Sequence, residues 1–288
     1  MPTILLASCC VLIAAAAMNA APLITYTGLP GTGIELVLPS SPEFASALTA
    51  SLGPDALTRY QAVLQYSVIV KNATSEALWL VAVRVSSNDA GTRVALTNQA
   101  MTTSPLPGMS SLGPGAMVML SGYSPLTRVL RPSVPRGLSA AMTGSTREMP
   151  GQSPEEEAAR LAKHSGIDIT LDCVVFADGG VIGPDEGHYM DQLIGQGRAQ
   201  TATLSDILNL SADDTRKYLS PTADAPMPET ARENGDPQVR WYERERWSLA
   251  RLLLDRLNAS KSEAEFHDFV QQMLRSDAKK PALKRRSS

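Results

Sequence analysis

The chain is poor in cysteine and in aromatic residues, and it has no excess of positive charge. Its 288 residues include 3 cysteines and 5% aromatics, and 26 Lys and Arg stand against 29 Asp and Glu. The formal net charge of -3 excludes an overall cationic field that would gather nucleic acid, so we expect no nucleic-acid partner. With 43% hydrophobic and 19% charged residues, a wholly disordered chain is also excluded.

The first apolar run is too short to cross a bilayer. Ile4 to Ala17 is uncharged over 14 residues, whereas a spanning helix needs about 20. That length is typical of a signal peptide, and the small residues Ala20 and Ala21 follow it as a cleavage site. No Lys or Arg precedes Arg59, so the usual basic start is missing. We nevertheless expect export, with lipidation at Cys9 or retention of the segment as alternatives.

Removal of that segment would leave Cys173 as the only cysteine. A single thiol cannot form a disulfide within its own chain, and it cannot build a cysteine-based zinc site. Cys173 is in phase with Ile167, Ile169 and Leu171, so we expect its side chain in the core.

Alternating apolar residues predict short strands in the first two thirds of the chain. Tyr60 to Val70 and Leu78 to Val85 are the clearest, and the others are 23–27, 34–38, 93–97, 116–120 and 167–176. No helical crossover pattern alternates with them, which favours an antiparallel sandwich. Ser, Pro, Gly and Thr dominate 121–153, which predicts a mobile insertion.

Helical patterns follow. Ser153-Pro154-Glu155 predicts a helix start, and after Pro184 apolar residues recur at helical spacings that Gly195 and Gly197 should weaken or break. The three prolines between residues 221 and 228 predict a linker. Regions 238–258 and 262–276 are amphipathic helices that we expect to pack against each other or against the sandwich. The predicted organisation is a signal peptide at 1–20, a β-sandwich at 21–184 with its insertion near 121–153, a helical region at 185–278 and a basic tail at 279–288.

Few residues suggest chemistry. The sequence contains no HExxH pair, no GxSxG elbow and no phosphate-binding loop. The densest polar group joins Asp178, Asp185 and His188, with Glu186 and Asp191 beside them. Oxygen ligands with one imidazole suit a divalent cation, so Asp178, Asp185 and His188 are the candidate metal ligands. The competing interpretation is structural, with a turn at Asp178-Gly179 and acids at a helix start. We assign no catalytic residue and expect no cofactor.

The C-terminal segment carries five cations and no acid from Lys279 to Arg286. Such a run is typical of a solvated, disordered end, and we expect it to be dispensable for the stability of the fold. The alternative is weak contact with an anionic surface.

Two segments carry a resemblance. Tyr66-Ser-Val-Ile-Val-Lys-Asn72-Ala-Thr-Ser75 and Asp172-Cys-Val-Val-Phe176-Ala-Asp178-Gly179 resemble a group of uncharacterised exported bacterial proteins, many of them acidobacterial. The resemblance implies an immunoglobulin-like β-sandwich and a periplasmic or extracellular location, and it carries over no site residue. The sequence therefore predicts an exported, non-enzymatic binding or envelope-associated module whose partner is a protein or envelope component. The alternatives are a hydrolase or metal-dependent enzyme with its site near Asp178–Asp191, and a cytosolic or membrane-side regulator.

Overall fold

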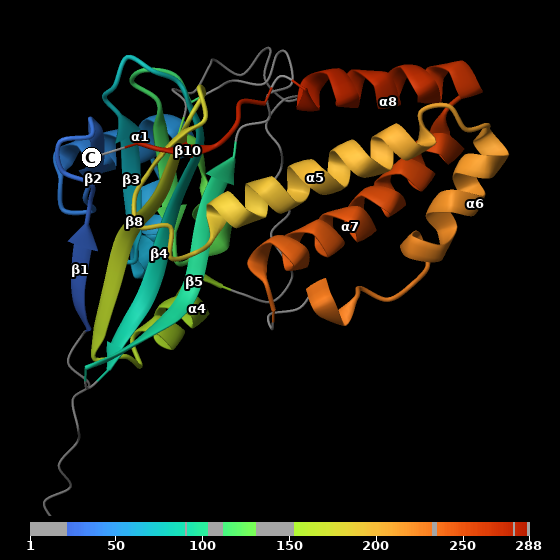
Figure 1. Ribbon diagram of the computed structural model, residues 1–288. Coiled ribbons are helices and arrows are strands. Elements are labelled where there is room, and N and C mark those ends of the chain that lie inside the picture. The colour runs from blue at the N-terminus through green and yellow to red at the C-terminus, as the bar shows by residue number, and fades with distance from the viewer. Residues whose placement is uncertain are drawn as a thin grey trace, which may run out of the picture.

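The computed structural model describes residues 22–89, 91–102, 112–130, 153–231, 235–278 and 280–286. Within these ranges the chain forms ten strands in two sheets and eight α-helices, so the expected mixture of β and α structure is confirmed (Figure 1). The predicted signal peptide at 1–20, with Cys9, lies outside the described residues, as does most of the predicted insertion, 131–152.

The larger sheet, sheet A, is built around one long strand. Its members are β1 (Leu23–Thr27), β4 (Leu78–Asp89), β5 (Thr92–Thr102), β8 (Gly166–Phe176), β9 (Gly180–Ile182) and β10 (Lys284–Arg285). Strand β8 pairs with β4 along one edge, and its other edge pairs with β1 and then with β9. The β1–β8 and β9–β10 pairs are parallel, so the prediction of a purely antiparallel sandwich is wrong at these two edges.

The smaller sheet, sheet B, is antiparallel throughout. It contains β2 (Ile34–Val37), β3 (Ser67–Asn72), β6 (Met117–Ser121) and β7 (Arg128–Leu130), paired in that order. A short 3₁₀ helix, η1 (Ser124–Leu126), joins β6 to β7. The predicted insertion therefore starts too early, because its first ten residues, 121–130, belong to this sheet and its connection.

The two sheets share one apolar core. Alternate side chains of both sheets meet there, since every second residue of a strand points to the same face. Among them are Val68 and Val70 of β3, Val81 and Val83 of β4, and Ile169 of β8, all buried.

Helices cover the outer face of sheet B. These are α1 (Pro42–Leu52), α2 (Ala56–Arg59) and α3 (Gln61–Leu64), which bury Phe44, Leu48 and Val63 against Ile69. The predicted strand from Tyr60 is wrong over its first half. Tyr60, Val63 and Leu64 have helical i, i+3, i+4 spacing, and all three lie in this second apolar cluster.

Helix α4 (Pro154–Leu161) begins where the sequence predicts. The Ser153 side chain accepts a hydrogen bond from the Glu156 N–H, and the Glu156 carboxylate accepts one from the Ser153 N–H. This capping box satisfies two backbone donors at the helix start.

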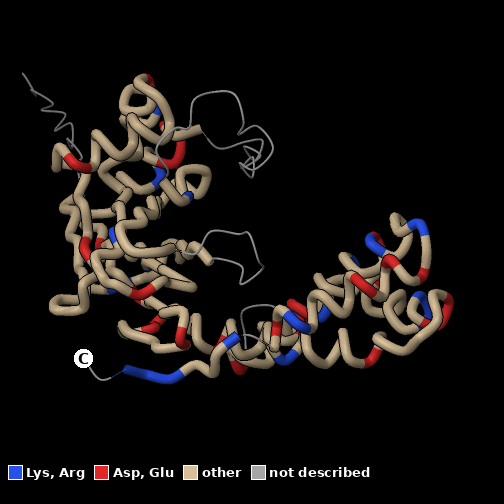
Figure 2. Tube along the Cα trace, turned by 90° about the horizontal axis from the view of Figure 1, so that it is seen from above, with Lys and Arg blue, Asp and Glu red and all other residues tan. Residues whose placement is uncertain are grey.

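The remaining helices form an elongated layer that projects from sheet A (Figures 1 and 2). They are α5 (Tyr189–Ile207), α6 (Ala212–Ala223), the 3₁₀ helix η2 (Glu229–Ala231), α7 (Pro237–Ala259) and α8 (Glu263–Asp277). One apolar cluster joins them and includes Leu253 of α7 and Phe266 and Val270 of α8. The predicted packing of the two C-terminal amphipathic helices is therefore confirmed.

Two details of this region correct the sequence-based interpretation. Helix α5 is continuous through Gly195 and Gly197. A β-carbon at Gly195 would lie only 2.6 Å from the Gln238 carbonyl oxygen of α7. Gly195 thus permits a close helix crossing and does not break the helix. Pro221 lies inside α6 near its end, so the predicted proline-rich linker is shorter than expected. Within the described ranges, no helix has the length and apolar character needed to cross a membrane.

Candidate functional site

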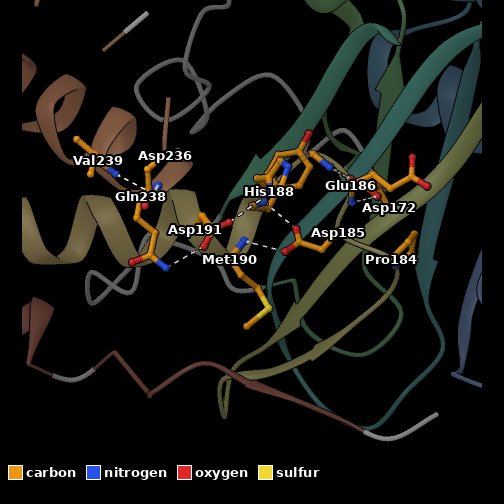
Figure 3. A network of polar contacts seen from close by, with 12 residues as sticks. Asp172, Pro184, Asp185, Glu186, His188, Met190, Asp191, Asp236, Gln238 and Val239 are labelled. Atoms are coloured by element: carbon orange, nitrogen blue, oxygen red, sulfur yellow. Dashed lines mark hydrogen bonds and ion pairs between the residues drawn. The ribbon is translucent and has the colours of Figure 1, made fainter. Parts of the chain in front are cut away.

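The loop between β9 and α5 contains two of the three candidate ligands, Asp185 and His188. It is anchored to β8 by Asp172, a residue that strand alternation predicts on the polar face of the sheet (Figure 3). In the pairing of β4 with β8, Ala82 lies opposite Cys173 and Val83 opposite Leu171, so Asp172 is the extra residue of a β-bulge. A bulge changes the direction of the side chain, and Asp172 is buried where a regular strand would expose it.

The Asp172 carboxylate is held by the backbone of the loop. Its two oxygens accept hydrogen bonds from the N–H groups of Glu186 and Gly187, both at 2.8 Å. Burial raises the pKa of Asp172 above its usual value, and the two N–H donors oppose that rise. Asp172 therefore serves as an acceptor that fixes the loop.

Asp185 is also buried, with a left-handed backbone at φ 58°. Its carboxylate accepts hydrogen bonds from the N–H groups of Tyr189 at 2.7 Å and Met190 at 3.3 Å. These are free donors at the start of α5, so Asp185 caps the helix. The Arg285 guanidinium lies 3.4 Å from the same carboxylate.

His188 is half exposed and precedes α5. Its Nδ1 lies 3.3 Å from Oδ2 of Asp191, and the other Asp191 oxygen accepts a hydrogen bond from the Gln238 side chain at 2.9 Å. Figure 3 shows these contacts as a chain that runs from β8 through the loop to the start of α7. The chain links the helical layer to sheet A.

Asp178 lies apart from this network, in the turn between β8 and β9. It accepts hydrogen bonds from the Gly180 N–H at 2.7 Å and from Arg286 at 2.8 Å. The Gly180 N–H, followed by Arg286, lowers the pKa of Asp178 below its usual value. Over the residues that the structure describes, no three His, Cys, Asp or Glu side chains are grouped to hold a metal ion. The structure thus does not bring Asp178, Asp185 and His188 together as a metal site, and it favours the structural interpretation.

Cys173 is fully buried, as predicted, but the predicted phase is wrong. Because it follows the bulge, it lies on the face of sheet A that α5 covers and not on the face of Ile167, Ile169 and Leu171. Burial, followed by the nearby charges of Asp185 and Asp172, raises the pKa of its thiol. A protonated, buried thiol is a poor nucleophile.

An open cleft of about 620 Å³ lies between α5, α7 and the C-terminal segment. Trp79 of β4, Leu193 of α5 and Tyr242 of α7 line it together with residues 280–283. Arg198 of α5 lies at the same cleft, with its guanidinium carbon 5.9 Å from the centre of the Tyr242 ring. The sequence analysis missed this cleft because its walls come from four separate parts of the chain.

Comparison of the chain with protein families, with curated proteins and with solved structures gives no match.

Proposed function

We propose that this protein is an exported, non-enzymatic binding or envelope-associated module, and that the cleft between α5, α7 and the C-terminal segment is its binding site. The observation that carries the proposal is the lining of the cleft. Aromatic and aliphatic side chains meet two cations there, Arg198 and Lys280, and the second of these is paired with Asp277 at 2.7 Å. Small-molecule sites combine a mainly apolar wall with a few polar groups that fix orientation.

The use of the carboxylates supports a non-enzymatic role. Asp172 and Asp185 accept backbone N–H groups, and Asp178 is paired with Arg286. Each acid that the alternative hydrolase or metal-dependent enzyme would need thus already has a structural partner.

The chemistry of the cleft indicates the class of ligand. Trp79, Leu193 and Tyr242 offer an apolar surface. In the described part of the chain Arg198 has no carboxylate partner within ion-pair distance, and its contact is the Tyr242 ring. We therefore propose an amphipathic ligand with a flat or extended apolar body and one anionic group.

Two fluorescent probes test this proposal. The anionic dye 8-anilinonaphthalene-1-sulfonate should bind the purified protein more tightly than the neutral N-phenyl-1-naphthylamine. Arg198→Gln should weaken binding of the anionic dye and leave the neutral one unchanged, whereas Trp79→Leu should weaken both. Arg216→Gln, which removes an exposed cation of α6, is the matched control. Equal loss for both arginine variants would reject the cleft as the binding site.

The proposed export has its own test. We propose cleavage after Ala20, so the mature protein should begin at Ala21, and mass spectrometry of the protein from the periplasmic or culture fraction measures this directly. An intact Met1 in most molecules would favour the regulator that keeps its N-terminal segment.

The finer description of the fold is likewise a proposal. We propose that the two-sheet core is an immunoglobulin-like sandwich, as the resemblance implies. The shared core of sheets A and B is compatible with it, and the parallel pairs at the edges of sheet A depart from the usual antiparallel pattern. An experimental structure would test it, because the strand order of the core should then match that of known immunoglobulin-like domains.

A further inference from the structure

The basic tail is part of the fold. Strand β10 pairs in parallel with β9, with Lys284 opposite Gly180 and Arg285 opposite Val181. The Lys284 N–H donates to the Gly179 carbonyl at 3.0 Å, and the Arg286 N–H donates to the Val181 carbonyl at 2.9 Å. The predicted disordered tail is therefore wrong for residues 280–286. Figure 1 shows this segment crossing from α8 to the edge of sheet A.

Arg286 is held by three side chains: Glu76 just before β4, Phe176 at the end of β8 and Asp178 in the turn that follows it. Its two terminal nitrogens contact the two Glu76 oxygens at 3.0 and 2.7 Å, and one also contacts Asp178 at 2.8 Å. Its guanidinium carbon lies 4.0 Å from the centre of the Phe176 ring. A bidentate ion pair combined with stacking on an aromatic ring is specific for arginine.

Two glycines leave room for the tail. A β-carbon at Gly179 would lie 2.3 Å from the Ala282 carbonyl oxygen, and one at Gly180 would lie 1.9 Å from Nε of Arg286. The Asp178-Gly179-Gly180 turn therefore does more than reverse the chain. The lack of side chains at Gly179 and Gly180 permits the close approach of residues 282–286.

We propose that residues 280–286 form a latch that closes one wall of the cleft. Engaged on β9, the segment places Pro281, Ala282 and Leu283 in the lining of the cleft, with Leu283 in the same apolar cluster as Trp79 and Leu193. Released, it leaves that wall open. The proposed regulation rests on the proposed function, because it concerns access to the same cleft.

The contacts that hold the latch are suited to reversible release. The side chains of Glu76 and Asp178 are 46% exposed, so salt screens their ion pairs with Arg286. The strand itself is only two residues long. The main apolar contact is Leu283, which packs with the cluster that contains Trp79 and Met190.

Hydrogen exchange measured by mass spectrometry on the full chain tests the latch itself. The C-terminal peptide should be protected in the parent protein. Arg286→Gln and Gly180→Ala should each speed its exchange about tenfold, which corresponds to about 1.4 kcal/mol. Lys284→Gln is the matched control, since it removes a tail charge whose closest carboxylate contact is longer, 3.6 Å to Asp178. It should change exchange less than twofold.

Hydroxyl-radical footprinting tests the coupling to the cleft without any ligand. Release of the latch should raise oxidation of Trp79 several-fold and leave that of Trp247 unchanged. A C-terminal peptide that is unprotected in the parent, or Trp79 oxidation that stays constant when the tail is released, would overturn the proposal. Protection that grows with protein concentration would also overturn it, because the occupant of β9 would then be the tail of a second copy.

The proposed function can fail separately from the latch. If neither naphthalene dye binds the cleft, the binding site is wrong, while exchange and footprinting still decide whether the latch exists. If the dyes bind but Arg286→Gln leaves their affinity and the Trp79 footprint unchanged, the latch does not control the cleft.

Discussion

The Asp172 carboxylate accepts a hydrogen bond from the Gly187 N–H at 2.8 Å, and this contact ties a bulge in β8 to the loop that begins α5. This contact leaves little space for a side chain at position 187, since a β-carbon there would lie 2.9 Å from the same Asp172 oxygen. The position of α5 against sheet A, and with it one wall of the cleft, thus depends on a buried acid.

Asp172→Ala should destabilise the protein strongly. It leaves the partly buried Glu186 and Gly187 N–H groups without their acceptor, at about 1 kcal/mol or more for each donor. Asp172→Asn should cost less, because its amide oxygen still accepts one of the two bonds. Denaturant unfolding measures both. Asp213→Ala, at an exposed acid of α6, is the control and should be neutral. Equal stability of the Ala variant and the control would contradict the anchoring role.

The packing of α8 predicts an order between two phenylalanines. Phe266 is fully buried in the helical cluster, whereas Phe269 is partly buried with Arg256 over its ring at 5.1 Å. Phe266→Ala should therefore cost about 3–5 kcal/mol, and Phe269→Ala clearly less. Thermal and denaturant unfolding of the two variants, compared with the parent, give the order. A larger loss at Phe269 would show that α8 is rotated about its axis.

Cys173 should be inert in the folded protein. Its side chain is buried beneath α5 and its pKa is raised by burial, so both access and thiolate formation are suppressed. A thiol reagent such as 5,5′-dithiobis(2-nitrobenzoate) should label the mature protein slowly in native buffer and completely in denaturant. Fast labelling under native conditions would show that α5 opens readily from sheet A.

Elements with a regular pattern and a good cap could be predicted from the sequence. Helix α4 follows from Ser153-Pro154 and α8 from its apolar spacing, and both begin where expected. Helix α1 was missed although Ser41-Pro42 has the same cap chemistry. The bulge at Asp172 could not be predicted, because it depends on how β8 pairs with β4, far away in the chain.

The candidate site failed for a related reason. Its spacing placed Asp178, Asp185 and His188 close along the chain, but the two acids are taken up by backbone N–H groups nearby and by arginines from the end of the chain. Arg285 and Arg286 approach Asp185 and Asp178 from about 100 residues away. Local sequence patterns carry no information on such contacts. The glycines at 179 and 180 were interpreted as turn residues. That explains Gly179, whose φ is 85°, but the lack of a side chain at Gly180 is explained by the docked Arg286.

Docking of the tail should depend on pH. Arg286 lowers the pKa of Glu76 through their hydrogen bonds, and the pKa of Asp178 is lowered by Gly180 and by Arg286. A carboxyl whose pKa is lowered by an interaction favours that interaction when ionised. The contribution is therefore complete above the ordinary values of 4.5 and 3.8, and it is lost as the pH falls through the lowered values.

Hydrogen exchange of the C-terminal peptide, corrected for the intrinsic effect of pH, should show this loss of protection in acid. The β8 peptide that contains Cys173 reports on global unfolding and should stay protected over the same range. Arg286→Gln should remove most of the pH dependence, because no other cation then lies as close to the two carboxylates. Lys284 remains, but it lies 3.6 Å from Asp178. Protection that persists in acid would mean that the backbone pairing of β10 and the packing of Leu283 hold the tail without the ion pairs.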